Sequence, residues 1–352
     1  MPNLAEETVP PDEPALIARL MAQNLALLDE SVRPVLRGQH PKHHGCVRGE
    51  FVVAEGLDAS LRHGLFASPG RFPALIRFSN GAAMDDRKGD AHGMAIKLFD
   101  VPGDKLLEPG DTHDFVLIDH PVFFARDVAG YVELFEALLK AKRSILPKLA
   151  FFLPRMIAEM GHVYLTHLHN HPAEMAIMRA MISKHPDSPL ELRYWSTTPY
   201  RLGPHAVHWS VQPDATLLRK VDPQNSPDKL RLALAEQLAN GEAAFDFMAQ
   251  LQTDPVAMPI EDPTQEWPES RSEWVKLATL KLPSQKPDTP ALMEFCEHLS
   301  FNPWRCIEEH RPLGGVNRAR KAIYEGITRR RHRLNEKPTA EPSLKDFQAL
   351  WE

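Results

Sequence analysis

Three observations predict an α+β protein with an antiparallel β-barrel core and appended helices. Short apolar runs with strand character lie between Gly- and Asp-rich turns in the first third of the chain. Helical spacing of apolar residues is found near both ends and again in the middle. The 32 prolines predict short elements with long irregular connections. Neither an all-helical nor an all-β class accommodates this mixture.

The first expected helix covers residues 14–29, where apolar residues repeat at helical spacing after a Pro-Asp-Glu-Pro start. Residues 1–14 are acidic and rich in proline, and we expect them to form a flexible arm. Residues 15–352 are expected to form a single domain. Further helical stretches are expected at residues 129–184, which prolines divide into pieces, and at 228–251, 292–299 and 316–331.

Residues 40–49 are polar and rich in histidine, and we expect a turn region there. Strands are expected at residues 51–53, 75–78, 94–99, 115–118, 206–211 and 274–282. The first four follow one another with turn residues between them, which is typical of an antiparallel meander.

The composition excludes several classes of protein. An apolar fraction of 43% and a charged fraction of 25% are typical of a soluble globular protein. The net charge of -6 argues against global attraction to nucleic acid or to an anionic membrane. The three cysteines, Cys46, Cys296 and Cys306, form no CxxC pair. They indicate neither a disulfide scaffold nor a zinc ribbon, and they favour a reducing, cytoplasmic location.

No segment of the sequence suggests targeting to a membrane or binding of a nucleotide. The N-terminus lacks the basic start and apolar core of a secretory signal. Prolines and charges interrupt the longest candidate for a membrane helix, residues 144–160. No Gly-rich phosphate loop follows an expected strand.

The pair of Arg320 and Tyr324 is the first candidate for chemistry. Four residues separate them on an expected helix, so both side chains lie on one face. A phenol is ordinarily protonated at neutral pH, so a metal-binding phenolate needs a cation such as Arg320 beside it. Taken alone, such a pair is more typical of an ordinary helix surface.

Two further pairs lie near the N-terminus. Arg37 precedes His40 by three residues, and a histidine is the natural proton carrier near neutral pH. Arg77 and Ser79 are two residues apart on an expected strand, so both point to the same side. Taken alone, the first pair is more typical of an exposed polar turn and the second of an exposed alternating strand.

Taken in their order along the chain, the three pairs and their neighbours resemble the haem-binding framework of catalases. The matching segments are residues 37–42, 77–79, 90–97, 121–127, 301–303, 320–324 and 331–334. The likeness runs from about Arg37 to Leu334 as short islands. Because the chain ends soon after the tyrosine helix, it resembles the small catalase-related haem peroxidases called minicatalases. The resemblance implies a barrel and helices that enclose haem b.

The resemblance also implies roles on the proximal side and at the haem edge. Tyr324 would ligate the iron, and Arg320 would stabilise its phenolate. Arg37 and Arg333 would contact haem propionates. Tyr131 lies near the position of a phenylalanine that stacks on the haem in the family.

On the distal side, the resemblance implies that His40 moves the peroxide proton and that Ser79 orients its ring. Arg77 would support the haem edge and a propionate. The family's distal asparagine falls on Ile118, and its absence puts fast dismutation of hydrogen peroxide in doubt. Asp119 is a candidate catalytic replacement, although a carboxylate offers a different charge and donor pattern.

Two histidines leave the assignment open. His43 and His44 stand before Gly45 where the family has a glycine directly, so His44 is the alternative distal histidine. We favour His40 because it keeps the arginine before it and the lysine after it. His92 replaces a family arginine, and we assign it no role.

The resemblance therefore predicts a haem peroxidase that acts on organic or lipid hydroperoxides or on hydrogen peroxide, with weak catalase activity. The expected partners are a small peroxide and an electron donor, with no nucleic acid and no integral membrane segment; a homodimer is an open alternative. Two other readings remain: a fatty-acid hydroperoxide isomerase or lyase similar to the allene oxide synthases, and a non-enzymatic haem-binding protein.

Overall fold

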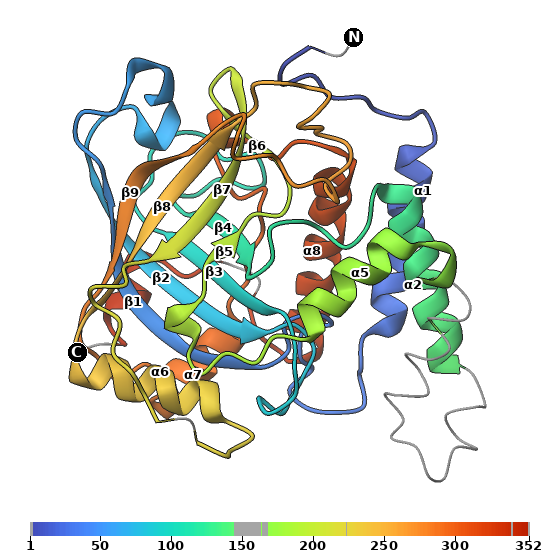
Figure 1. Cartoon of the computed structure of the whole chain (residues 1–352). Coiled ribbons are helices and arrows are strands. Elements are labelled where there is room, and N and C mark those ends of the chain that lie inside the picture. The colour runs from blue at the N-terminus through green and yellow to red at the C-terminus, as the bar shows by residue number, and fades with distance from the viewer. Residues whose placement is uncertain (1–2, 144–162, 164–167, 223, 339–340, 351–352) are drawn as a thin grey trace.

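The computed structural model describes residues 3–143, 163, 168–222, 224–338 and 341–350. A twisted antiparallel barrel forms its centre (Figure 1). The strands are β1 (His43–Val53), β2 (Arg71–Asn80), β3 (His92–Leu98), β4 (His113–Ile118), β5 (Tyr194–Trp195), β6 (Tyr200–Leu202), β7 (His205–Pro213), β8 (Ala243–Leu251) and β9 (Trp274–Leu282). They pair in the order β5-β4-β3-β2-β1-β9-β8-β7-β6, and a further pairing of β5 with β7 closes the barrel. The predicted α+β class with an antiparallel barrel core is confirmed.

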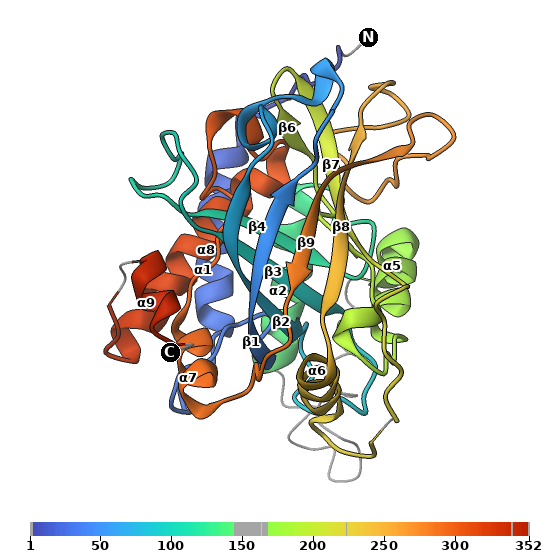
Figure 2. The same cartoon turned by 90° about the vertical axis from the view of Figure 1, so that its left-hand side faces the viewer.

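Helices cover the outside and one end of the barrel (Figures 1 and 2). They are α1 (Glu13–Leu27), α2 (Val128–Arg143), α5 (Pro172–Ile182), α6 (Lys229–Asn240), α7 (Pro290–His298), α8 (Gly315–Leu334) and α9 (Leu344–Gln348). Short 3-10 helices lie at Ala59–Leu61, Gly64–Phe66, Leu168–Asn170, Pro189–Glu191 and Glu308–His310. Helices α1, α2 and α8 pack together beside the barrel, with a core of their own around Leu20, Val132 and Ile323.

Aromatic side chains fill the barrel interior. Phe247 contacts Phe51, Phe115 and Trp209, with ring centroids 5.1, 4.7 and 5.5 Å away. Because side chains alternate along a strand, the residues between the inward-facing ones point out of the barrel. The barrel is therefore a packed core, and its outer face is free to build a site against the helices.

Two sequence predictions are wrong in detail. Residues 243–251, expected to continue a helix from 228, form strand β8. Gly241 ends α6, and Phe245, Phe247 and Ala249 then alternate inward, which is the period of a strand. Residues 43–49, expected in a turn region, belong to β1, where they pair along β2.

The N-terminal segment, expected to form a flexible arm, runs across the start of α8. The Glu7 carboxylate pairs with Arg318 and, at 2.8 Å, with Arg311. The backbone N–H of Thr8 donates to Glu261 at 2.9 Å. These contacts tie the segment to the body of the protein.

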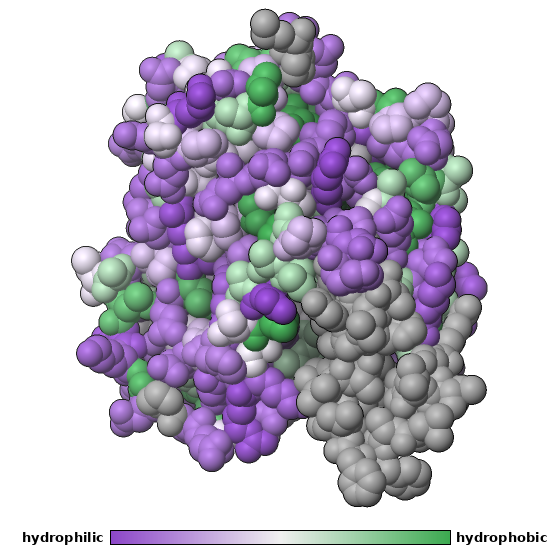
Figure 3. Space-filling view, turned by 45° about the vertical axis from the view of Figure 1, so that its right-hand side comes forward, coloured by the Kyte–Doolittle hydropathy of each residue, from purple (hydrophilic) through white to green (hydrophobic). Residues whose placement is uncertain are grey.

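Hydrophilic residues dominate the face of the described part in Figure 3, with small apolar patches between them, as on most folded proteins. Within the described residues, no helix is long and apolar enough to span a membrane. Residues 144–160, the longest apolar candidate in the sequence, lie outside the described part of the chain.

Candidate active site

A cavity that is partly open to solvent lies between the outer face of the barrel and helix α8. Strands β2, β3 and β4 form its barrel side, α1 and α8 its helical side, and the segments around residues 37–40 and 299–301 complete it. The residues that line it are Asn24, Arg37, Gly38, Gln39, His40, Arg77, Ser79, Gly93, Met94, Ala95, Val116, Leu117, Leu299, Ser300, Phe301, Ile323, Tyr324, Ile327, Thr328 and Arg331. All three polar pairs of the sequence analysis therefore contribute to the cavity or to its immediate support.

His40 and Ser79 lie on the barrel side. The Nδ1 atom of His40 is 3.1 Å from the Ser79 hydroxyl oxygen, which fixes the orientation of the imidazole ring. Burial and the charge of Arg77 lower the pKa of His40 to about 3. The ring is therefore neutral at ordinary pH and able to accept a proton.

The backbone of His40 is held in an unusual conformation. Its φ angle of 54° is in the left-handed region, which is costly for a residue with a side chain. The Arg77 guanidinium donates to the His40 carbonyl oxygen at 2.8 Å, and the His40 N–H donates to the Gly81 carbonyl oxygen at 2.8 Å. Arg77 thus positions His40 as well as lining the cavity.

Three arginines lie near one carboxylate at the edge of the cavity, and two of them pair with it. Arg37 and Arg331 both pair with Glu297, Arg37 at 3.3 Å. Arg77 is buried beside them, and its Nε atom has no hydrogen-bond partner among the described residues. Burial and the charge of Arg37 lower the pKa of Arg77 and of Arg331 to about 9 each. This excess of buried positive charge is suited to an anionic group such as a carboxylate.

Tyr324 lies on the helical side of the cavity. The Arg320 guanidinium donates to its hydroxyl oxygen at 3.3 Å. Arg320 also donates to Thr198 and Asn317, both at 3.0 Å, so its position is fixed from several directions. Burial acts to lower the pKa of Arg320, but the phenol oxygens of Tyr324 and Tyr200 raise it above its usual value. The cation needed to stabilise a Tyr324 phenolate is therefore in place.

Arg333, predicted to contact a propionate, is exposed and is not among the cavity residues. Arg331, two residues earlier, lines the cavity instead and is 2% exposed. Arg331 is seven positions after Tyr324, close to two helical turns, so both lie on one face of α8. Arg333 is nine positions after Tyr324 and is turned away from it by roughly 180°. This spacing could have identified Arg331 from the sequence.

Asp119, predicted as a catalytic residue, does not line the cavity. Its carboxylate accepts from the backbone N–H of His92 at 2.8 Å and lies 2.9 Å from His92 Nδ1. Lys184 is 3.5 Å away. With both oxygens engaged, Asp119 supports His92 and acts on His40 only through its charge, which raises the pKa of His40 against the effect of burial.

Tyr131, predicted near the haem-stacking position, is also absent from the cavity wall. It is 2% exposed and packs between Phe123 and Phe135, with ring centroids 5.4 and 4.9 Å away. Burial raises the pKa of its phenol above the usual value, while a hydrogen bond with Gln39 acts in the opposite direction. Tyr131 thus supports Gln39, which does line the cavity.

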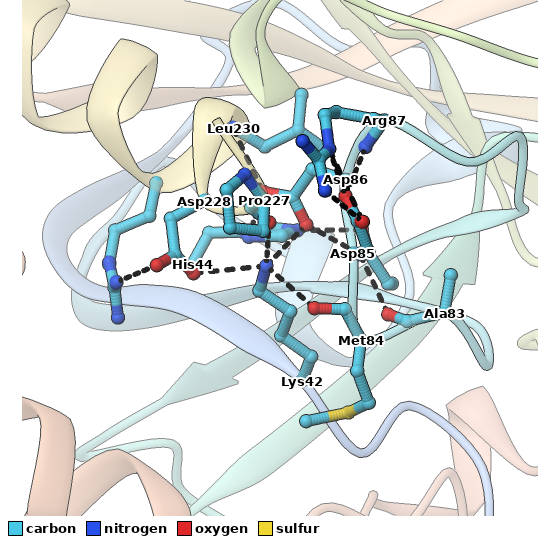
Figure 4. A network of polar contacts seen from close by, with 12 residues as sticks. Lys42, His44, Ala83, Met84, Asp85, Asp86, Arg87, Pro227, Asp228 and Leu230 are labelled. Atoms are coloured by element: carbon cyan, nitrogen blue, oxygen red, sulfur yellow. Dashed lines mark hydrogen bonds and ion pairs between the residues drawn. The ribbon is translucent and has the colours of Figure 1, made fainter. Parts of the chain in front are cut away.

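His44, the alternative distal histidine, lies in a separate buried network (Figure 4). Its Nε2 atom is 2.9 Å from the Asn80 side-chain oxygen, and Asn80 donates to Asp86 at 2.8 Å. Asp86 in turn pairs with Lys42 at 2.6 Å. Of the two histidines, only His40 lines the cavity.

Comparison with known proteins shows which solved structures this architecture resembles. No protein-family model and no curated protein matches the sequence. Solved structures do match. A fungal catalase has 17% identity and a TM-score of 0.60 over 97% of this chain and 69% of its own. Catalase A from Saccharomyces cerevisiae has 17% identity and a TM-score of 0.61 over 96% of this chain and 70% of its own. A bacterial catalase has 15% identity and a TM-score of 0.62 over 97% of this chain and 66% of its own.

The fold is catalase-like. The predicted resemblance is confirmed at this level, since the likeness extends over nearly the whole chain. The chain spans 66 to 70% of the length of these three catalases.

The cavity of this catalase-like fold has the residues that a haem requires. Tyr324 with Arg320 offers a hard anionic ligand for ferric iron. The unpartnered Nε atom of Arg77, beside Arg37 and Arg331, offers a place for propionates. Apolar residues Val116, Ile323 and Ile327 line the space between these two polar ends.

Proposed function

We propose that this protein is a haem-dependent peroxidase that reduces hydroperoxides. The observation that carries the proposal is that one cavity is lined by both Tyr324, 3.3 Å from Arg320, and His40, 3.1 Å from Ser79. A metal ligand and a proton carrier on the two sides of one cavity are what heterolysis of a peroxide O–O bond requires. The likeness to catalases supports the same conclusion.

Each residue has a defined task in this proposal. Tyr324 would hold the iron of haem b, with Arg320 stabilising its phenolate. Arg37, Arg77 and Arg331 would hold the propionates. When bound, the haem supplies a metal that binds the peroxide and exchanges electrons with it.

His40 moves the proton. Since Ser79 engages Nδ1, we assign Nε2 of His40 as the atom that accepts the peroxide proton and returns it to the leaving oxygen. The low pKa of His40, about 3, keeps the ring in the neutral, accepting form. The strained backbone, tied to Arg77, limits how far the ring can move.

The lining of the cavity favours organic hydroperoxides. Val116, Ile323 and Ile327 line it. Ile118, which follows Leu117 on β4, stands where the resemblance to catalases places a polar asparagine. Apolar side chains favour an alkyl or lipid chain over the small, polar hydrogen peroxide. We therefore expect peroxidase turnover to exceed dismutation of hydrogen peroxide.

The absorbance spectrum of the protein expressed with added haem tests the proposal. We expect a ferric Soret band that Tyr324→Phe shifts or removes. Tyr200→Phe is the matched control, because the Tyr200 hydroxyl also contacts Arg320, at 3.5 Å, but does not line the cavity. A colourless protein that does not take up haem would refute the proposal.

Product analysis then separates the enzymatic alternatives. With a fatty-acid hydroperoxide and an electron donor, a peroxidase yields the corresponding alcohol. A rearranged product formed without a donor would instead identify an isomerase or lyase. If the hydroperoxide is unchanged, the result would favour a non-enzymatic haem-binding protein.

A further inference from the structure

Two cysteines lie directly behind the three arginines of the cavity. Cys46 on β1 faces Arg77 across the sheet, and Cys296 lies near the end of α7. Both are fully buried and belong to one apolar cluster with Leu75. The Cys296 sulfur is 3.6 Å from the carbonyl oxygen of Gly45, the residue before Cys46. The fold therefore brings together two thiols that are distant in sequence, and both are reduced.

The surroundings make the two thiols unequal. Burial acts to raise the pKa of the Cys296 thiol, but a hydrogen bond from Cys46 and the charges of His43 and Arg77 hold it well below its usual value. Burial raises the pKa of the Cys46 thiol, and so does its neighbour Cys296. A thiolate beside a protonated thiol is the arrangement that thiol–disulfide chemistry uses.

The backbone of Cys296 is also hydrogen-bonded to a residue that lines the cavity. Arg37, which lines the cavity, donates to the Cys296 carbonyl oxygen at 3.4 Å, and Arg37 and Arg331 bind Glu297, the next residue. Residues that line the cavity therefore contact the chain at Cys296 and at the residue after it.

We propose that Cys46 and Cys296 form a redox-active thiol pair, and that the hydroperoxide admitted to the neighbouring cavity oxidises it to a disulfide. The choice of oxidant rests on the proposed function. The Cys296 thiolate attacks the terminal peroxide oxygen, the O–O bond breaks, and the released alkoxide takes up a proton to become the alcohol. The Cys46 thiol then attacks the Cys296 sulfenic acid, the S–S bond forms, and water leaves. Two electrons pass from sulfur to the peroxide.

Cys306 provides an internal comparison. It is also buried, but burial and the charges of Asp114 and Glu308 raise its pKa far above the usual value. It has the protonated, inert form expected of a structural cysteine. Any special reactivity should therefore be confined to the other two thiols.

Counting thiols by mass tests the proposal. Reduced protein is treated with diamide or, separately, with an equimolar amount of tert-butyl hydroperoxide, and is then unfolded in excess N-ethylmaleimide. We expect adducts on all three cysteines before oxidation and only on Cys306 after either oxidant, with a peptide that links Cys46 to Cys296. Cys306→Ser should form the same link. Cys46→Ser treated with the hydroperoxide should leave a Cys296 sulfenic acid that dimedone traps.

Several outcomes would overturn the proposal. Adducts on all three cysteines after both oxidants would do so, as would a link that includes Cys306 or a link formed by diamide but not by hydroperoxide. The assay counts free and linked cysteines and does not measure turnover. Its result can therefore contradict the thiol pair without contradicting the proposed peroxidase function, and the reverse. A protein that binds haem and consumes hydroperoxide with all its thiols intact refutes only the thiol pair. A protein that forms the link but takes up no haem refutes only the peroxidase.

Discussion

Gly93 lies so close to the imidazole of His40 that a Cβ atom at this position would come within 2.6 Å of Nδ1. The same atom would also be 2.8 Å from the Ser79 hydroxyl oxygen. Gly93 pairs with Ser79 across β2 and β3, so the backbone of one strand forms the surface on which the His40 ring rests. The orientation of His40 therefore depends on the absence of a side chain at Gly93.

Gly93→Ala should displace the His40 ring and break its contact with Ser79. We expect the rate of hydroperoxide consumption to fall by roughly tenfold or more, since positioned proton transfer contributes at least that much. Gly110→Ala is the control, because a Cβ atom there would meet nothing within 4 Å. Steady-state assays of both variants, beside their thermal unfolding, measure the effect; equal rates would contradict it.

Arg331→Gln should weaken haem binding roughly tenfold, the amount expected for one lost charge-assisted hydrogen bond. Arg333→Gln, two residues along the same helix, should bind haem as the wild type does because Arg333 is exposed. Titration of haem into the apoprotein, followed by Soret absorbance, gives both affinities. A larger loss in the Arg333 variant would mean that the propionate contact lies elsewhere.

Asp86→Asn should destabilise the fold by about 3–5 kcal/mol, because it leaves the buried Lys42 ammonium without its closest carboxylate. The neighbouring Asp85 pairs with Arg87 on the surface, so Asp85→Asn should change stability little. Urea unfolding of the two variants makes the comparison. Similar midpoints would show that Asp228, 3.1 Å from Lys42, is a sufficient partner.

Acid should destabilise the protein as the pH falls from about 6.5 towards about 3. Burial lowers the pKa of His40 and of His208 to about 3 each, so the unfolded chain takes up these protons first. Stability from these histidines is present above about pH 6.5 and is lost as the pH falls towards the folded pKa values.

His208→Asn should therefore flatten the dependence of the unfolding free energy on pH in this range. His208 lies outside the cavity, 4.3 Å between ring centroids from Trp267, so the variant leaves the candidate site intact. The exposed His169→Asn is the control and should retain the wild-type slope. Denaturant unfolding at several pH values checks this, and parallel slopes in all three proteins would argue against a buried neutral His208.

Local sequence pattern predicted correctly which residues share a face where residues repeat at the period of a helix or of a strand. The Arg320–Tyr324 spacing placed both residues on one helical face, and the alternation of Arg77 and Ser79 placed both on one side of a strand. It failed at residues 243–251, because a strand buried on one face by Phe245 and Phe247 has the same apolar content as a helix. It did not indicate that Asp119 and Arg333 lie outside the cavity wall, because these two residues were assigned by position along the chain and not by direction in space.

The sequence by itself determined the barrel-and-helix class, because short-range spacing dictates which side chains share a face. The choice of Tyr324 and His40 as candidates came from the ordered set of segments that resemble catalases. Only the tertiary structure decided that His40 and not His44 lines the cavity, that Arg331 and not Arg333 lines it, and that Cys46 lies beside Cys296. Those relationships depend on strand register and on the packing of α7 and α8 against the barrel. Contacts between distant segments are determined by the burial of whole elements, which no local pattern encodes.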